Sequence, residues 1–263
     1  MSDEHNLGSS SGWPEILGKI RQRTAARIFV ERGAAYSTQM ELGLRSAHAN
    51  AVDAVWTGFD LQHGFPADFV ARWNLFQVSS QAQSKSQFLL RPDLGRRLSD
   101  ESRRAIAESC PKSCELQVVI GDGLSTAAVR AQVPGLLPLL QQRALNRGWS
   151  FGQAFAVRYC RVGIMNEIGD LLAPQVIVLL IGERPGLATA ESLSAYMAFR
   201  PQTGQTDADR NLISNIHARG VQVEEAAHRI VNLAAQMLAM KLSGIRVKEQ
   251  KGLPKPSIEP IRR

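Results

Sequence analysis

The pattern of apolar and polar residues divides the chain into two regions of different character. Up to about residue 110, apolar residues recur mostly at helical spacing. This pattern predicts a helical N-terminal region with helices over residues 15–59, 65–75 and 99–110. Between the last two, residues 86–91 fit a loop or a short strand, and Pro92-Asp93 predicts a turn.

Beyond Leu116, short apolar runs rich in β-branched residues alternate with helical segments. The sequence predicts strands over 116–121, 155–162, 176–182 and 193–199, the last because apolar residues alternate at period two. Helices are expected over 163–172 and 224–244, with Gly244 as the C-cap, and over 126–149, interrupted at Pro134-Gly135.

Strands that alternate with helices predict an α/β fold with a parallel sheet. We therefore expect a helical N-terminal region followed by a Rossmann-like, mainly parallel sheet flanked by helices. The expected organisation is a disordered N-terminus (residues 1–13), a helical region (14–110), an α/β domain (111–245) and a basic tail (246–263).

Composition narrows the class of protein. The chain is 44% hydrophobic and 21% charged, as in ordinary globular proteins. Because no apolar run approaches the ~18–20 residues of a membrane helix and the N-terminus does not resemble a secretory signal, we expect no membrane and a cytoplasmic location. The odd set Cys110, Cys114 and Cys160 fits reduced thiols better than a metal site or a disulfide framework.

The basic net charge does not indicate a nucleic-acid-binding face. Of the net +7, +5 lies in residues 241–263, which contain no aromatic residue for base stacking. We expect this tail to lie on a partner protein. A nucleic-acid-binding protein that uses the tail is the less favoured alternative.

Two of the expected strands end in glycine followed by an acid, at Gly121-Asp122-Gly123 and Gly182-Glu183. Since ligands of α/β sheets bind outside the carboxyl ends of the strands, this coincidence indicates a site. The alternatives are a plain strand-to-helix turn at Asp122 and a surface ion pair between Glu183 and Arg184. The sequence contains no Rossmann or phosphate-loop glycine pattern and no G-x-S-x-G or H-E-x-x-H motif, so a binding role is favoured over catalysis.

Residues 215–220 read N-x-H-x-x-G, one substitution away from the D-x-H-x-x-G motif through which some cobalamin proteins supply a histidine to cobalt. The aspartate of that motif fixes the tautomer and basicity of the imidazole, and Asn215 provides no such anion. We therefore expect His217 not to ligate a metal. A role in orienting the backbone near a ligand stays open.

Several segments together resemble the small (light) subunit of ethanolamine ammonia-lyase. They include RTAARIFVERGAAY, LLRPDLGRRL, VVIGDGLSTAAV, RYCRVGIMNEIGD, GERPGL and TDADRNLISNIHARG, and they extend from about Arg23 to Ile245. The resemblance implies an adenosylcobalamin-dependent enzyme that converts ethanolamine to acetaldehyde and ammonia by radical chemistry, active only as a hetero-oligomer with a large subunit that holds the substrate pocket.

The resemblance also implies that the α/β domain binds the cofactor. By position, the cobalamin contacts fall at Val162, Glu183 and Leu212, with no catalytic residue and no metal ligand in this chain. Val162 and Glu183 are also expected at strand ends. The rival functions are a stand-alone α/β enzyme or small-molecule-binding protein and a cobalamin carrier. Packaging in a bacterial microcompartment is left undecided by the N-terminus.

Overall fold

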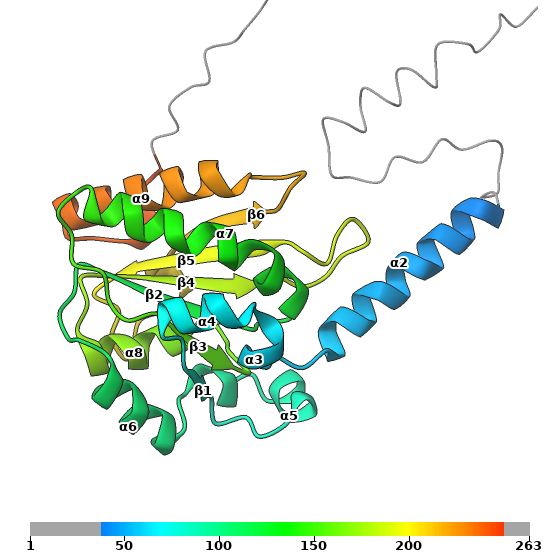
Figure 1. The fold of residues 1–263 in the computed structure, drawn as a ribbon, viewed down its shortest axis with the longest axis horizontal. Helices are drawn as coiled ribbons and strands as arrows, with labels where there is room; N and C mark the ends of the chain where they lie inside the picture. Colours follow the sequence, from blue (N-terminus) through cyan, green and yellow to red (C-terminus); the bar gives the residue numbers. More distant parts are fainter. Residues whose placement is uncertain (1–37, 250–263) are drawn as a thin grey trace, which may run out of the picture.

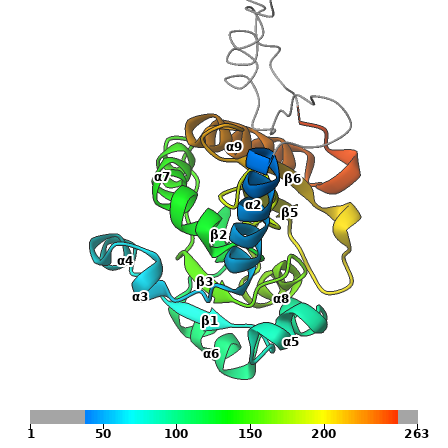
Figure 2. The same ribbon diagram turned by 90° about the vertical axis from the view of Figure 1, so that its right-hand side faces the viewer.

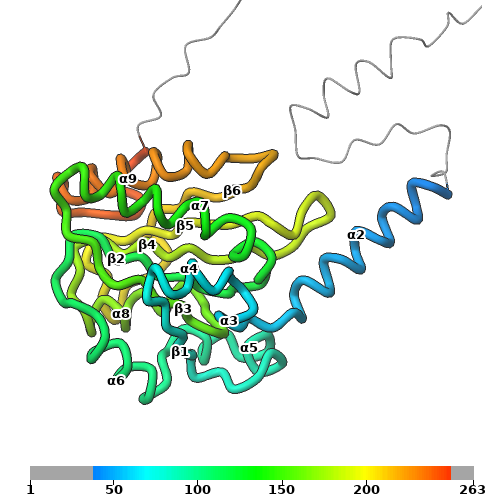
Figure 3. Tube along the Cα trace, viewed as in Figure 1, coloured from blue at the N-terminus to red at the C-terminus, as the bar shows by residue number. Residues whose placement is uncertain are grey.

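The computed structural model describes residues 38–249. The N-terminus expected to be disordered, the first part of the expected long helix and most of the basic tail lie outside these residues. Helix α2 (Thr38–Trp56) confirms the second part of that helix. It extends away from the sheet, as the tube in Figure 3 shows, and Ala47 is its buried residue.

A six-stranded sheet forms the centre of the molecule, in the order β1-β3-β2-β4-β5-β6 (Figure 1). Its strands are β1 (Gln77–Ser79), β2 (Leu116–Gly121), β3 (Phe155–Arg158), β4 (Val176–Gly182), β5 (Leu193–Phe199) and β6 (Asn211–Ile216). The first four are parallel, whereas β5 and β6 join antiparallel. The expected mixed α/β fold with a mainly parallel sheet is confirmed, with an antiparallel edge.

Helices cover both faces of the sheet, and Figure 2 shows the layers end-on. One face packs against α7 (Thr126–Leu145), α9 (Val223–Met240) and the short helices α3 (Leu61–Gly64) and α4 (Ala67–Trp73). The other packs against α6 (Asp100–Ser109) and α8 (Ile164–Leu172). Along β2, Val118 faces the first layer and Val119 the second, as expected for a strand buried on both sides.

The N-terminal region contributes strand β1 and the short helices α3 and α5 (Lys85–Leu90), none of which the sequence pattern predicted. Strand β1 adds to the edge of the sheet beside β3, so residues 77–79 belong to the sheet although they lie between the expected helices of the helical N-terminal region. Residues 85–90, in the segment expected as loop or short strand, form helix α5, because the Ser84 hydroxyl caps its N-terminus by accepting from the Gln87 N–H. The Ser99 hydroxyl likewise caps α6 by accepting from the Ser102 N–H.

Helix α7 is continuous, so the expected interruption at Pro134-Gly135 is wrong. Pro134 and Pro138 both lie inside it, although each proline removes a backbone hydrogen bond and costs about 3 kcal/mol. Both prolines are half-buried. The fully buried face of the helix, with Leu136, Leu137 and Leu140, packs on the sheet and offsets that cost.

The end of α9 also differs from the prediction. The helix stops at Met240, and Lys241 takes the left-handed cap conformation at φ 53°. Gly244 instead begins the short 3-10 helix η3 (Gly244–Arg246) at φ 77°. A Cβ at Gly244 would lie 2.0 Å from the Ala208 carbonyl oxygen, so this glycine is required by close packing and by its conformation.

Candidate functional site

The carboxyl ends of β2, β3 and β4 meet at one edge of the sheet. The chain leaves β2 through α7 on one face and leaves β3 through α8 on the other. Adjacent strands whose connections diverge in this way open a crevice between their ends, where α/β proteins bind ligands. The Gly121-Asp122-Gly123 turn and the loop after β3 form the two sides of this crevice.

Asp122 ties these two sides together. Its side chain is buried, and its two carboxylate oxygens accept hydrogen bonds from the backbone N–H groups of Tyr159 and Cys160, each at 2.8 Å. Tyr159 has a φ of 58°, a conformation that the carboxylate helps to hold. Asp122 is therefore a structural anchor for the loop that carries Val162. Both oxygens point into the protein, which disfavours a stand-alone enzyme that uses Asp122 as a base.

Burial raises the pKa of Asp122 to about 6, against the opposing effect of the two backbone N–H groups. Between about pH 4 and pH 6 the folded protein thus keeps a proton that the unfolded chain has lost, so stability falls as pH rises. From pH 4 to pH 7 we expect the wild type to lose about 2 kcal/mol of unfolding free energy relative to Asp122→Asn, whose amide does not titrate. Urea unfolding of both proteins at each pH measures this difference, and equal pH profiles would contradict it.

Glu183 follows β4 directly, as expected, and its carboxylate is held by three donors. Oε1 accepts from the Asn215 backbone N–H at 2.8 Å and from the Ser194 hydroxyl at 2.7 Å, and Oε2 accepts from the Ser192 hydroxyl at 2.7 Å. Among the ion pairs of residues 38–249, none joins Glu183 to Arg184. The alternative of a surface Glu–Arg pair is therefore wrong.

The N-x-H-x-x-G segment is a tight turn that presents the Asn215 N–H to Glu183. Asn215 is left-handed at φ 62°, and its side-chain oxygen lies 2.8 Å from Nε2 of the buried His217. Nδ1 of His217 accepts from the Arg219 N–H at 3.3 Å. A Cβ at Gly220 would lie 2.2 Å from the Asn215 carbonyl oxygen, which explains the glycine.

Because both ring nitrogens of His217 are engaged within this turn, neither faces a ligand. The N–H on Nε2 and the lone pair on Nδ1 correspond to a neutral imidazole, and burial lowers the pKa of His217. The geometry agrees with the expectation that His217 does not ligate cobalt. It gives the residue the orienting role that the sequence left open, through Asn215.

The three residues singled out as cofactor contacts line one pocket of about 370 Å³ on the α8 side of the crevice. Glu183 lies at the end of β4. Leu212 lies on β6, opposite Tyr196 of β5, and is 46% exposed. Val162 lies in the turn before α8, not at the end of a strand, because β3 stops at Arg158. The prediction that Val162 ends the second strand is wrong, yet the loop still brings it to the pocket.

Sequence reasoning missed other residues of this pocket. Ser194 and Tyr196 alternate with Leu193 and Ala195 along β5, so the period-two pattern that predicted the strand also placed them on its opposite face. The alternation along residues 193–199 was therefore sufficient to predict that Ser194 and Tyr196 share a face. No local signal marked Arg161, which lines the pocket from the loop after β3.

The cysteines and the helices add two observations on function. Cys110, Cys114 and Cys160 are free and buried, and burial raises the pKa of Cys114 to about 11, so its thiol is a poor nucleophile at neutral pH. No helix between residues 38 and 249 has both the length and the apolar character needed to span a bilayer.

Comparison with known proteins places the chain in a family. The family model for the ethanolamine ammonia-lyase light chain (EutC) matches residues 14–248. The chain belongs to this ethanolamine ammonia-lyase light-chain family. The resemblance drawn from the sequence segments is thereby confirmed.

Relatives named ethanolamine ammonia-lyase small subunit match over most of their length. One from Clostridium perfringens is 40% identical over 235 residues, which are 89% of this chain and 78% of that protein. One from Listeria monocytogenes is 40% identical over 231 residues, 88% of this chain and 77% of that protein. One from Fusobacterium nucleatum is 39% identical over 239 residues, which are 90% of this chain and 79% of that protein. For an ethanolamine ammonia-lyase light chain, a large-subunit partner follows from the family.

Proposed function

We propose that this chain is the small subunit of an adenosylcobalamin-dependent ethanolamine ammonia-lyase and that it supplies one wall of the cobalamin site. The observation that carries the proposal is the convergence of Val162, Glu183 and Leu212. They lie on three separate segments, and all three line the same pocket.

The lining of the pocket fits the chemistry of a corrin. A corrin has a broad apolar ring with primary amides around its edge, so its site needs apolar side chains and a few hydrogen-bonding groups. The lining of the pocket includes four apolar side chains, those of Leu124, Val162, Ile181 and Leu212. Hydrogen-bonding groups in its lining include Glu183 and Ser194. Leu212 is 46% exposed beside the opening, an aliphatic surface that a bound ring would cover.

Glu183 has one acceptor position left for a ligand. A carboxylate offers about four lone-pair sites. Asn215 and Ser194 occupy the two lone-pair sites of Oε1, and Ser192 occupies one of the two on Oε2. The second site on Oε2 is left for an amide N–H of the corrin edge. Because its three protein donors hold the carboxylate in place, Glu183 binds the cofactor and transfers no proton in the reaction.

The other residues position or shield the cofactor. Asp122 holds the loop that presents Val162, and the turn at His217 holds the N–H group that orients Glu183. When bound, adenosylcobalamin supplies radical chemistry for the conversion of ethanolamine to acetaldehyde and ammonia. The substrate pocket and the groups that contact substrate belong to the large subunit, which closes the site from the other side.

Reconstitution tests this function. The chain is mixed with a large subunit of the same family, adenosylcobalamin and ethanolamine, and acetaldehyde is followed against each protein alone. We expect turnover only in the mixture. Turnover by this chain alone would support a stand-alone enzyme. Tight corrin binding by the chain alone, without activity in the mixture, would support a carrier. Inactivity in the mixture, with a large subunit shown to be active with another small subunit, would contradict the proposal.

A further inference from the structure

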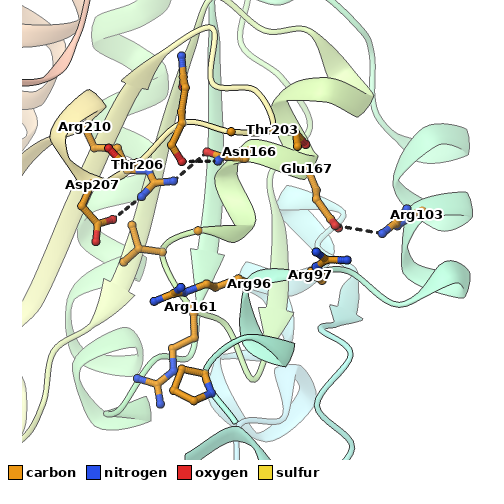
Figure 4. A pocket seen from close by; sticks show the side chains of 15 residues that line it. Arg96, Arg97, Arg103, Arg161, Asn166, Glu167, Thr203, Thr206, Asp207 and Arg210 are labelled. Carbon is orange, nitrogen blue, oxygen red and sulfur yellow. Dashed lines mark hydrogen bonds and ion pairs between the residues drawn. The ribbon is translucent and has the colours of Figure 1, made fainter.

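A second and larger pocket, of about 690 Å³, adjoins the proposed corrin site. It shares Arg161 and Val162 with that site, so the two pockets are neighbours across the loop after β3. Its lining comes from four regions of the chain, as Figure 4 shows: η1 (Leu94–Arg96) with the residues around it, Arg103 on α6, the start of α8 with the loop before it, and residues 203–210 before β6.

This pocket carries more positive charge than its own carboxylates neutralise. Five arginines line it against two acids. Arg103 pairs with Glu167 at 3.0 Å, and the buried Arg210 pairs with Asp207 and donates to Asn166. No ion pair found within residues 38–249 neutralises the remaining three, which are Arg96, Arg97 and Arg161.

Arg161 is held in place but keeps donor capacity. Its guanidinium lies over the Phe88 ring, 4.2 Å from the centroid, and donates to the Phe88 carbonyl oxygen at 3.1 Å. Its Nε is buried and has no hydrogen-bond partner among the described residues. Burial and the neighbouring charge of Arg96 lower the pKa of Arg161. The positive charges of Arg96 and Arg161 thus lie near each other, and the buried Nε–H of Arg161 donates to no group in the described part of the protein. This arrangement is typical of an anion site.

Close packing sets the positions of Arg96 and Arg161. The Arg161 backbone N–H donates to the Gly95 carbonyl oxygen at 2.8 Å. A Cβ at Gly95 would lie 2.6 Å from Cγ of Arg161, and a Cβ at Gly163 would lie 3.0 Å from Cγ of Arg96. The two glycines thus let the aliphatic stems lie against the backbone, and the guanidinium groups are directed by the fold.

We propose that the pocket around Arg96 and Arg161 binds the phosphodiester of the nucleotide loop of cobalamin. This inference rests on the proposed function, because it assumes that the corrin lies in the adjoining pocket. The phosphodiester is the fixed anion of a cobalamin, and the planar guanidinium is well suited to phosphate oxygens. A pocket of this size accommodates a nucleotide-sized group. Arg161, which lines both pockets, lies where the loop leaves the corrin edge.

Comparison of two corrinoids tests the proposal. Cobinamide has the corrin of cobalamin but lacks the nucleotide loop and its phosphodiester. The complex of this chain with the large subunit is titrated with each corrinoid by equilibrium dialysis and visible absorbance. Arg96→Gln is expected to raise the Kd for cobalamin by about tenfold or more and to leave the Kd for cobinamide within about twofold. Arg161→Gln, whose side chain also lines the corrin pocket, is expected to raise the Kd for cobalamin more than the Kd for cobinamide.

Arg104→Gln is the matched control, because it removes one positive charge from the exposed surface of α6 and does not line the pocket. It should change neither Kd. Arg96 is exposed, so Arg96→Gln keeps the test valid if Arg161→Gln, which removes a packed side chain, impairs folding. Thermal unfolding of each variant and its assembly with the large subunit are measured in parallel.

Three results would overturn the inference. They are an unchanged Kd for cobalamin in both variants, an equal loss of affinity for both corrinoids, and weaker assembly with the large subunit at unchanged cobalamin affinity. The last result would assign the arginines to acidic side chains of the partner. A wild-type complex that binds neither corrinoid would contradict the proposed function itself, and the phosphodiester site with it.

Discussion

Glu183→Gln is expected to raise the Kd of the reconstituted complex for cobalamin by about tenfold or more. The glutamine amide turns an NH₂ group toward at least one of the donors that Glu183 accepts, which are the Ser192 and Ser194 hydroxyls and the Asn215 N–H. It also removes the anionic acceptor offered to the corrin amide. At saturating cobalamin the turnover number should stay within about twofold, because Glu183 only binds the cofactor.

The control for this prediction is Glu191→Gln, an exposed acid one residue before Ser192. It removes the same charge from the same loop and should leave the Kd for cobalamin unchanged. Equilibrium dialysis gives the affinities, and acetaldehyde release gives the rate. If turnover at saturating cobalamin instead fell by orders of magnitude with unaltered affinity, Glu183 would act in the chemistry and the binding role assigned to it would be wrong.

Gly182→Ala is expected to lower the free energy of unfolding by more than about 3 kcal/mol. A Cβ at this position would lie 1.9 Å from the Ser125 carbonyl oxygen and 2.9 Å from that of Asp122. Both of these oxygens are backbone atoms, so they cannot move aside as a side chain could. The Leu124 N–H also donates to the Gly182 carbonyl oxygen at 3.1 Å, which holds the end of β4 against the turn after β2. The end of β4 would therefore have to separate from the turn after β2, which also opens the pocket.

Gly186→Ala provides the comparison, since a Cβ there meets no atom within 4 Å. It changes glycine to alanine four residues away in the same segment and should alter the unfolding free energy by no more than about 1 kcal/mol. Guanidinium unfolding of both variants measures the two effects. Equal stability of the two variants would show that the close approach at Gly182 is not rigid.

The parts of the fold that were predictable are those whose burial repeats along the chain. Strand β4 is apolar on both faces, β2 is apolar except at Gln117, and β5 alternates, so period and length identify all three. The elements missed depend on distant contacts. β1 has three residues and exists because it pairs with β3, and α7 stays helical through two prolines because its buried face packs on the sheet.

The candidate site was predictable only in part for the same reason. Glu183 could be placed because a strand end carries it directly to the edge of the sheet. Leu212 reaches the pocket through the pairing of β6 with β5, and the arginine pocket joins Arg96 and Arg161 through packing of Gly95 and Gly163. These contacts link residues far apart in sequence, which a local pattern does not record.

The measurement that tests the account most directly is a cryo-electron microscopy structure of this chain in complex with its large subunit and cobalamin. We expect the corrin between the two subunits, with Val162, Glu183 and Leu212 in van der Waals or hydrogen-bonding contact with it and the Oε2 atom of Glu183 facing a corrin amide. Density for the cofactor that lies wholly within the large subunit, with the pocket of this chain filled by solvent, would contradict the account.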